Sequence, residues 1–340
     1  MNTVITTAVD DRRIVALRLL FARFPVEEQE ARLREALLSA ERGTLKLDDL
    51  LLAESDGLPV GAALVMPQSD GVALVWPPVV SCGAVDETAV EDRLMQEVCQ
   101  RIDAANARLG QCLLAPDDVA EANLLSRHGF ERAAELFFLA RTLTESDVAT
   151  EAADSNGACS LQSHPSHESH SSHQSHPSHQ SSSTTRMTIE RYCDANSHRF
   201  ARVVEESYQG SLDCPYLTGF RNGVDAIASH KLPGVFDPDR WALYSLGEKD
   251  VGVVLLNDHP DQDAVELVYL GVTPSARGQG LGQRMLQQGL SESARRGRAV
   301  IFLAVDCENS YANSLYRDCG FEELARRQIL LRRSARLVRQ

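Results

Sequence analysis

The chain has 340 residues, of which 43% are hydrophobic, and a formal net charge of -14. That length fits two ordinary domains of a globular protein, and the acidic balance argues against nucleic acid as the main partner, because phosphate binding needs a basic surface. No apolar stretch reaches the length of a membrane-spanning helix, and the N-terminus lacks the apolar core of a signal peptide. The eight cysteines form no C-x-x-C pair. We therefore expect a cytoplasmic protein with reduced thiols, no membrane partner and no zinc site.

The charge is divided unevenly along the chain. Residues 1–185 contain 14 Lys and Arg against 28 Asp and Glu, whereas residues 186–340 contain 20 of each. A polyanionic ligand should therefore prefer the second half.

The two halves repeat one order of predicted elements. Residues 51–66, LLAESDGLPVGAALVM, and 241–257, WALYSLGEKDVGVVLLN, each alternate like a pair of strands around a turn. In each half a strand, a long amphipathic helix, another strand and a short helix follow. The short helices end in Gly-Phe, in LLSRHGFE and LYRDCGFE. This repetition predicts a duplicated domain, residues 1–145 and 186–340, whose copies pack against each other within the chain.

Residues 146–185, between the halves, are rich in Ser and His and predict a disordered linker. Six histidines recur there at every third position: His164, His167, His170, His173, His176 and His179. Such a tract can bind transition metals, so metal storage is one possible function. The spacing places the imidazoles on no shared helical face, and no carboxylate or cysteine pattern completes a site. A tether without metal is therefore favoured.

The strongest functional signal is ELVYLGVTPSARGQGLGQRM at residues 266–285. An apolar strand ends at Pro274, and helical spacing of apolar residues begins at Leu281 and stops at Gly297. The glycines between them therefore lie at a helix N-terminus, where unpaired backbone N–H groups and a positive dipole favour phosphate or pyrophosphate. No acidic residue occurs from 267 through 291. Neither a Walker loop nor a G-x-G-x-x-G fingerprint fits the spacing.

Two spaced motifs resemble the signatures of the GNAT superfamily of acyl-CoA-dependent N-acyltransferases. Arg277-x-x-Gly280-x-Gly282 matches the Q/R-x-x-G-x-G/A signature, and residues 309–321 resemble N-x-x-A-x-x-L-Y-x-x-x-G-F. The resemblance covers the second half well and the first half in outline. It implies an α/β (α+β) architecture of tandem GNAT folds, each a mixed, mostly antiparallel sheet flanked by helices. It also implies acetyl transfer from acetyl-CoA, the co-substrate, to an amine that attacks the thioester directly, without a metal.

The resemblance further implies where acetyl-CoA would bind. Its pyrophosphate would lie on the amides of the glycine-rich turn, and its pantetheine arm would follow the preceding strand. The residues that match these positions are Leu270, Gly271, Val272, Arg277, Gly278, Gln279, Gly280, Leu281, Gly282, Gln283, Asn309 and Ala312.

Two residues are candidates for proton transfer. Glu266 is the best-placed carboxylate to take a proton from the amine, whose ordinary pKa is about 10. Tyr316 occupies the superfamily position of the acid that protonates the leaving thiolate, and a strand N–H near Val272 would stabilise the oxyanion. Structural roles stay open for Tyr316 as a core aromatic, Glu266 as a surface carboxylate and Asn309 as a helix N-cap.

The acceptor side is less defined. In this superfamily the first two helices and their loop line it, here SYQGSLDCPYLTGFRNG at residues 207–223. Tyr208, Asp213, Tyr216 and Arg221 could contact a polar acceptor, and an ordinary polar surface loop explains them equally well. The acceptor is a small molecule or a protein amine. A non-catalytic acyl-CoA-binding regulatory module is the alternative function, and the presence of both proton-transfer candidates favours the enzyme.

The first half has lost these features. Pro77 and Pro78 lie in the strand whose amides would meet the pantetheine arm, and proline has no N–H. Only Gly83 remains of the glycine-rich turn, and Leu125 stands where the second half has Tyr316. Four carboxylates that would repel a pyrophosphate crowd the next helix start: Asp86, Glu87, Glu91 and Asp92. We therefore predict that the first half binds no acyl-CoA and instead packs against the active copy or shapes its acceptor cleft.

Overall fold

The computed structural model describes residues 3–68, 70–81, 86–105, 107–149, 187–217 and 222–335. The described residues up to 149 form the N half, and those from 187 onward form the C half. The N half contains β1 (Thr3–Thr7), α1 (Asp11–Phe21), α2 (Val26–Glu41), β2 (Asp49–Ser55), β3 (Leu58–Pro67), β4 (Val72–Val80), α3 (Glu87–Ala104), β5 (Leu109–Leu114), α4 (Val119–Arg127), β6 (Glu131–Thr142) and α5 (Glu145–Ala149). The C half contains β7 (Met187–Arg191), α7 (Ser197–Tyr208), α8 (Gly223–His230), β8 (Val235–Phe236), β9 (Ala242–Leu246), β10 (Lys249–His259), β11 (Ala264–Val272), α9 (Leu281–Arg295), β12 (Val300–Asp306), α10 (Ser310–Asp318) and β13 (Glu322–Arg333).

The halves share one succession of elements, as the repeated sequence pattern predicts. In each, a strand and two helices precede a hairpin, and then strand, long helix, strand, short helix and strand follow. The first hairpin turns at Asp56 and Gly57, with φ of 50° and 80°, and the second turns at Gly247, with φ of 61°. Positive φ is what a tight hairpin turn requires, which explains the Asp-Gly signal in the sequence.

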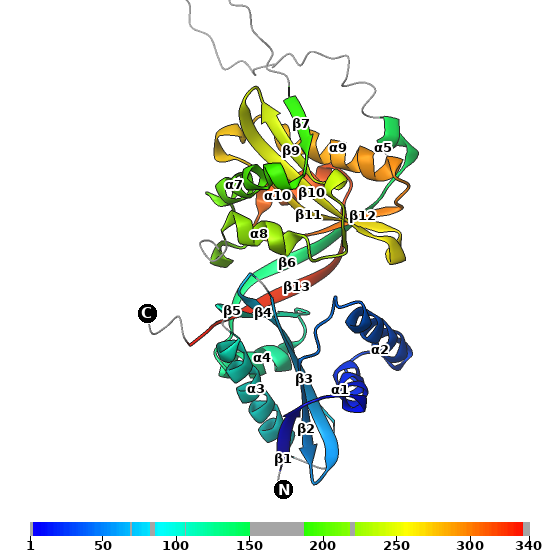
Figure 1. The fold of residues 1–340 in the computed structure, drawn as a ribbon, viewed down its shortest axis with the longest axis vertical. Coiled ribbons are helices and arrows are strands. Elements are labelled where there is room, and N and C mark those ends of the chain that lie inside the picture. Colours follow the sequence, from blue (N-terminus) through cyan, green and yellow to red (C-terminus); the bar gives the residue numbers. More distant parts are fainter. Residues whose placement is uncertain are drawn as a thin grey trace, which may run out of the picture.

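All but one of the strands follow a single path through one sheet, in the order β1-β2-β3-β4-β5-β13-β6-β12-β11-β10-β9-β7, and β8 pairs with β10 off this path. The last strand of each half is exchanged: β13 lies between β5 and β6, and β6 lies between β13 and β12. Both long strands cross the middle of the molecule between the halves (Figure 1). Because each half would lose a central strand without the other, the copies are joined by backbone hydrogen bonds as well as by packing.

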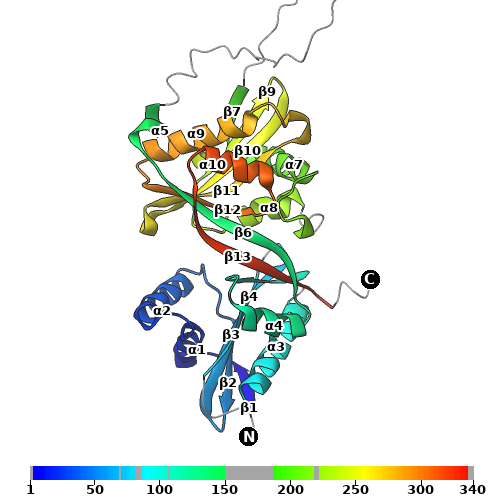
Figure 2. The ribbon, with the colours of Figure 1, turned by 180° about the vertical axis from the view of Figure 1, so that it is seen from behind.

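Each half is a three-layer arrangement with helices on both faces of the sheet (Figure 1 and Figure 2). Alternation along β2 shows how the sequence builds it. Leu50 and Leu52 pack in the core beneath α1 and α2, whereas Leu51 and Ala53 pack in the core beneath α3 and α4. In the C half, α7 and α8 cover one face and α9 and α10 cover the other.

The sheet opens at an equivalent place in each half. β11 and β12 are paired in parallel only where Ala264–Glu266 meets 300–302, and β4 and β5 only where Val72–Leu74 meets 109–111. Beyond these pairs the strands diverge. Each half therefore has a V-shaped opening in which one edge of β11 or β4 lacks a neighbouring strand.

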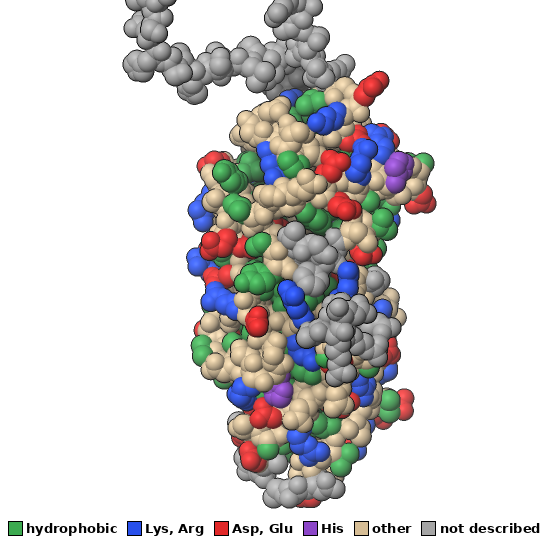
Figure 3. Space-filling model, turned by 90° about the vertical axis from the view of Figure 1, so that its left-hand side faces the viewer, with side chains coloured by type: hydrophobic (Ala, Val, Ile, Leu, Met, Phe, Trp, Pro, Cys, Tyr) green, Lys and Arg blue, Asp and Glu red, His purple; other side chains and the backbone are tan. Residues whose placement is uncertain are grey.

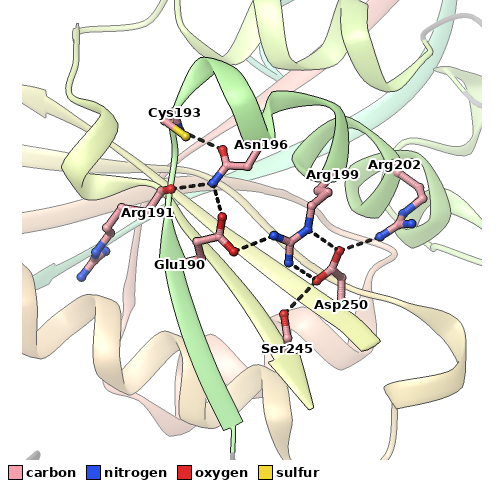
Figure 4. A network of polar contacts seen from close by, with 8 residues as sticks. All are labelled: Glu190, Arg191, Cys193, Asn196, Arg199, Arg202, Ser245 and Asp250. Atoms are coloured by element: carbon pink, nitrogen blue, oxygen red, sulfur yellow. Dashed lines mark hydrogen bonds and ion pairs between the residues drawn. The ribbon is translucent and has the colours of Figure 1, made fainter. Parts of the chain in front are cut away.

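A buried carboxylate fastens α7 to the sheet (Figure 4). Asp250 of β10 accepts hydrogen bonds from Arg199, from Arg202 at 2.6 Å and from Ser245 at 2.8 Å. Arg199 also pairs with Glu190 of β7 at 2.6 Å. The hydrogen bonds from Arg199 hold the pKa of Asp250 below its usual range. This network fixes the helix whose C-terminal end borders the site described below.

The predicted linker is described only at its N-terminal end. The histidine tract and residues 150–185 of the predicted linker lie outside the described residues, and residues 146–149 belong to α5, which lies against α9.

Figure 3 shows acidic, basic and hydrophobic side chains interspersed over one side of the molecule. In the part of the chain that the structure describes, no group of three His, Cys, Asp or Glu residues could hold a metal ion. No described helix is long and apolar enough to cross a bilayer.

Candidate active site

A cavity of about 770 Å³ fills the opening between β11 and β12, and we call it the C-half cleft. Its walls come from the free part of β11, the start of α9, the end of β12, α10 and the segment after α7. All but one of the predicted coenzyme-binding residues line it: Leu270, Gly271, Val272, Arg277, Gly278, Gly280, Leu281, Gly282, Gln283, Asn309 and Ala312. Gln279, the exception, donates from Nε2 to the carbonyl of Ser275 at 3.3 Å.

The glycine turn, residues 277–283, has the conformation that an anion site needs. Gly278 and Gly280 have φ of 74° and 73°, a left-handed region that disfavours other residues, and open space surrounds both. Gly280 is the N-cap of α9 and makes no side-chain capping bond. The amides of the first helical turn therefore lack partners within the helix, and the residues of this turn line the C-half cleft at the positive end of the helix dipole.

Arg277 has a structural task in addition to its place on the cleft wall. Its guanidinium donates to the carbonyl oxygens of Ser207 at 2.7 Å, Gln209 at 2.8 Å and Val272 at 3.2 Å. Two of these carbonyls belong to the C-terminal end of α7, where a cation is favourable. Arg277 thus joins the glycine turn to the predicted acceptor side, a role the motif did not reveal.

Helix α10 brings Asn309 and Tyr316 to the opposite wall. Asn309 is the N-cap, and its Oδ1 accepts from the amide of Ala312 at 3.2 Å, so capping accounts for at least part of its role. Tyr316 is 7% exposed and lines the cleft. Burial, reinforced by the Asp213 carboxylate, raises the pKa of the phenol. Tyr316 is therefore protonated at neutral pH and can act as a proton donor.

Asp213 is the only carboxylate on the wall of the C-half cleft within the described residues. Its Oδ1 accepts from the amide of Asp306 at 3.1 Å, and Asp306 Oδ2 accepts from the amide of Cys214 at 2.9 Å. Cys214 has φ of 43°, a conformation that costs a non-glycine residue roughly 1 kcal/mol or more. These reciprocal bonds hold Asp213 and Cys214 against the end of β12.

The environment of Asp213 weakens its acidity. Asp213 is exposed to solvent in the open cleft, and the protein atoms around its carboxylate displace only part of the water that would solvate its charge. This partial desolvation raises the pKa of Asp213, repulsion from the Asp306 carboxylate adds to the rise, and the hydrogen bond from the Asp306 amide opposes it. A carboxylate of this kind is better matched to taking a proton near neutral pH than an ordinary surface carboxylate.

Tyr269 is a cleft residue that sequence reasoning missed. The pairing of β10 with β11 shifts between Leu255 and Leu256, which turns Tyr269 toward α7. Its hydroxyl lies 2.7 Å from Ser207 Oγ, and its ring stacks on His230 at 5.2 Å. Burial raises the pKa of its phenol. An irregular strand register is invisible in the alternation of apolar residues, so no sequence signal identified this orientation.

Three other predicted residues that the structure describes do not line the C-half cleft: Glu266, Tyr208 and Tyr216. Glu266 Oε2 lies 2.9 Å from Nε2 of His259. Tyr208 packs edge-on to Tyr269 at 5.9 Å, and Tyr216 is 55% exposed. Arg221 lies outside the described residues.

The equivalent place in the N half differs at each functional position. Pro77 and Pro78 lie in the free part of β4, and buried Leu125 faces the core from α4. Asp86 caps α3 by accepting from the amide of Ala89 at 3.2 Å, so a carboxylate occupies the helix end that the C half leaves open. Gly83 lies outside the described residues.

Comparisons with known proteins agree with this geometry. Residues 215–321 match the model of the acetyltransferase (GNAT) family. A mycothiol acetyltransferase of Kocuria rhizophila is 38% identical over 95 residues, 26% of this chain and 31% of that protein. One from a Nocardioides species is 26% identical over 219 residues, 60% of this chain and 63% of that protein. The chain thus matches less than two thirds of the length of both relatives.

Longer matches support the tandem architecture. A mycothiol acetyltransferase of Stackebrandtia nassauensis is 25% identical over 302 residues, 87% of this chain and 84% of that protein. A GCN5-related N-acetyltransferase from Sphaerobacter thermophilus superposes with a TM-score of 0.56 at 18% identity, over 97% of this chain and 95% of that one. A tandem GNAT protein from the clavulanic acid biosynthesis pathway gives a TM-score of 0.54 at 12% identity, over 98% of both chains. At such identities the two structures speak for the fold alone. The chain therefore has a tandem GNAT fold, and residues 215–321 of its C half match the acetyltransferase (GNAT) family model.

Proposed function

We propose that the C half transfers an acetyl group from acetyl-CoA to an amine, which attacks the thioester directly. The observation that carries the proposal is that an open glycine turn, a strand edge without a neighbour and a buried phenol line one cavity. Pyrophosphate would accept hydrogen bonds from the amides of the glycine turn, and the pantetheine arm would pair with the free edge of β11. The Tyr316 end of the cleft then receives the thioester.

Acetyl transfer needs one group that takes a proton and one that gives a proton. The amine must reach the carbonyl carbon as a neutral nucleophile, and the departing sulfur needs a proton as the C–S bond breaks. Tyr316 would supply the second proton, because its phenol is protonated and lies on the cleft wall. A free N–H of β11 near Val272 would stabilise the oxyanion.

Two carboxylates compete for the role of proton acceptor. Glu266 was expected from the sequence, but it does not line the cleft and is hydrogen-bonded to His259. Asp213 lines the cleft together with Tyr316, and partial desolvation raises the pKa of its carboxyl group. The geometry therefore favours Asp213 as the acceptor of the amine proton, with Glu266 as the second candidate.

The acceptor itself is restricted by the charge of the wall. Within the described residues, Arg277 and Asp213 are the charged residues that line the C-half cleft, and Arg277 is engaged with backbone carbonyls. The charge that remains for a ligand beside Tyr316 is thus negative. A cationic ammonium, the protonated form of the acceptor, is attracted to such a site.

A turnover assay separates this function from a non-catalytic coenzyme-binding module. Thiol release from acetyl-CoA is measured against a panel of primary amines, with calorimetric titration of CoA in parallel. We expect saturable CoA binding and amine-dependent thiol release. Binding without release on any amine would support the module, and absence of binding would reject both.

A further inference from the structure

The N half contains a second large cavity, of about 620 Å³, which we call the N-half cavity. It lies in the opening between β4 and β5, so it is the counterpart of the C-half cleft. Its volume falls within the range of small-molecule sites. The prolines of β4 and the carboxylate that caps α3 make it unsuited to acyl-CoA, so a different ligand must be considered.

Aromatic rings form one wall of the N-half cavity. Phe21 lies 5.8 Å from Trp76 and 6.3 Å from Phe24, measured between ring centroids, and both pairs are tilted. The guanidinium carbon of Arg32 lies 3.9 Å from the centre of the Phe24 ring, so the planar guanidinium adds a positive charge beside that ring. Such a wall favours a planar ring, because edge-to-face and offset stacking add to burial of apolar area.

The charged side chains on the wall of the N-half cavity indicate that the ring of the ligand carries an anionic group. Arg23 is paired with Asp118 at 3.2 Å, and Arg32 is paired with Glu28 at 2.8 Å. Arg327 also lines the cavity and donates to the carbonyl of Arg326 at 2.7 Å, and within the described residues it forms no ion pair with a carboxylate. Arg327 therefore retains donors for a ligand.

One arginine suits a carboxylate better than a phosphate. Arginine binds a carboxylate through two parallel hydrogen bonds, whereas polyanions are usually held by several cations or by a helix N-terminus. Asp117 and Asp118 also line the N-half cavity and would repel a doubly charged group. A monoanion therefore fits the wall best.

We propose that the N-half cavity binds a small aromatic carboxylate, with its ring against Trp76 and Phe21 and its carboxylate on Arg327. The strand exchange makes this site a property of the whole chain, because Arg327 belongs to β13 of the C half and the rings belong to the N half. The proposal does not depend on acetyl transfer.

The test is calorimetric titration of the full chain with 2-naphthoate, in the presence of saturating CoA so that the C-half cleft is occupied. We expect saturable binding of one naphthoate per chain. Arg327→Gln should weaken it about tenfold or more, because the bidentate pair is lost. The matched control is Arg326→Gln, since Arg326 is exposed and pairs with Glu323 at 2.7 Å. We expect the control to change affinity less than twofold.

Two further probes separate the ring from the charge. 2-Naphthalenemethanol keeps the ring without the carboxylate, and octanoate keeps the carboxylate without the ring; each should bind at least tenfold more weakly than 2-naphthoate. Absence of saturable binding, equal affinity of the Arg327→Gln variant, or octanoate binding as tightly as naphthoate would overturn the proposal. Failure here leaves CoA binding and thiol release unaffected, so it is distinct from failure of the proposed function.

The location can be checked by fluorescence. The chain has two tryptophans: Trp76 on the cavity wall and Trp241, which is fully buried in the C half. 4-Nitrobenzoate, an aromatic carboxylate that quenches indoles, should quench the wild-type chain saturably. Trp76→Phe should remove that saturable quenching. Quenching that persists in Trp76→Phe would place the probe elsewhere and contradict the assignment.

Discussion

The N half and the C half have the same succession of elements and a cavity at an equivalent place, but they differ in the groups that the proposed chemistry requires. Both have an opening where two parallel strands separate, and both openings hold a cavity of several hundred Å³. The opening follows from sheet topology, so it persists whatever side chains line it. The coenzyme binding proposed for the C half requires free backbone N–H groups. In the N half, Pro77 and Pro78 of β4 have none, and Asp86 already accepts from the amide of Ala89 at the start of α3.

The comparison also shows that the halves are not independent. β6 of the N half pairs with β12 of the C half, and β13 of the C half pairs with β5 of the N half. The N half supplies β6 as the neighbour of β12, so we expect the C half to need the N half for folding whether or not the N half binds a coenzyme. This dependence gives a physical reason for the retained fold, apart from any ligand that the N-half cavity binds.

The largest expected effect of the asymmetry is at the phenol that only the C half has. Tyr316→Phe should lower kcat for thiol release about 10²–10³-fold, because the thiolate loses its proton donor, while CoA affinity changes little. Tyr311→Phe is the matched control: Tyr311 also lines the C-half cleft but is 81% exposed. Steady-state kinetics and calorimetry measure the two effects. If Tyr316→Phe kept more than a third of wild-type kcat, Tyr316 would be a packing residue.

The next effect concerns the proton acceptor. Asp213→Asn should lower kcat/KM about 10–100-fold, whereas Glu266→Gln should lower it less than threefold. The reverse order would return the role to Glu266, and equal small effects would point to proton transfer by water. Both variants keep side-chain size, so thermal unfolding serves as the check on folding.

The pH dependence sharpens this test. Partial desolvation raises the pKa of Asp213, and a base works only when deprotonated, so wild-type kcat/KM should rise as pH rises through that raised pKa. The titratable groups that interact with Asp213 are Asp306, Tyr316 and Tyr269. Asp213→Asn should remove this limb of the profile. The limb due to the acceptor amine is common to both proteins, so the difference between profiles isolates Asp213.

Local parts of the site could be predicted from the sequence, and parts that depend on distant contacts could not. The strand before Pro274, the helix beginning at Leu281 and the glycine turn between them follow from spacing alone, and the structure places them as expected. The exchange of β6 and β13 could not be predicted, because strand pairing between residues nearly 200 positions apart leaves no periodicity.

Contacts between residues distant in the sequence also explain why the arrangement of the acceptor side could not be predicted. Asp213 gains its environment from Asp306, 93 positions away, and a loop residue carries no local sign of such a partner. Tyr269 changes face because of a register shift in its strand. Arg277 matches the coenzyme motif, but its guanidinium contacts the end of α7. Motifs specify which residue types a site needs and leave the orientation of side chains to tertiary contacts.

A smaller effect, on CoA affinity, is expected from replacing a glycine of the glycine turn. Gly280→Val should weaken CoA binding about tenfold, because valine disfavours φ of 73° by roughly 1–2 kcal/mol and the amides shift away from the anion. Gly43→Val is the matched control, since Gly43 in the N half has φ of 74° and open space around it. Both should lower thermal stability similarly, and only the first should weaken CoA binding in calorimetry. Equal CoA affinity in the two variants would show that the glycine turn does not bind the coenzyme.

The smallest effect is an expected lack of rescue. In the Tyr316→Phe background, Leu125→Tyr places a phenol at the N-half position that corresponds to Tyr316. Thiol release should stay at the level of the single variant, because a proton donor is useless where β4 has no amides to hold a pantetheine arm. Leu125 is fully buried, so the larger ring should also cost about 1–3 kcal/mol of stability, which thermal unfolding would report. A tenfold recovery of thiol release would mean that the N half still binds acetyl-CoA, and that the two halves differ by a single side chain rather than by their backbone donors.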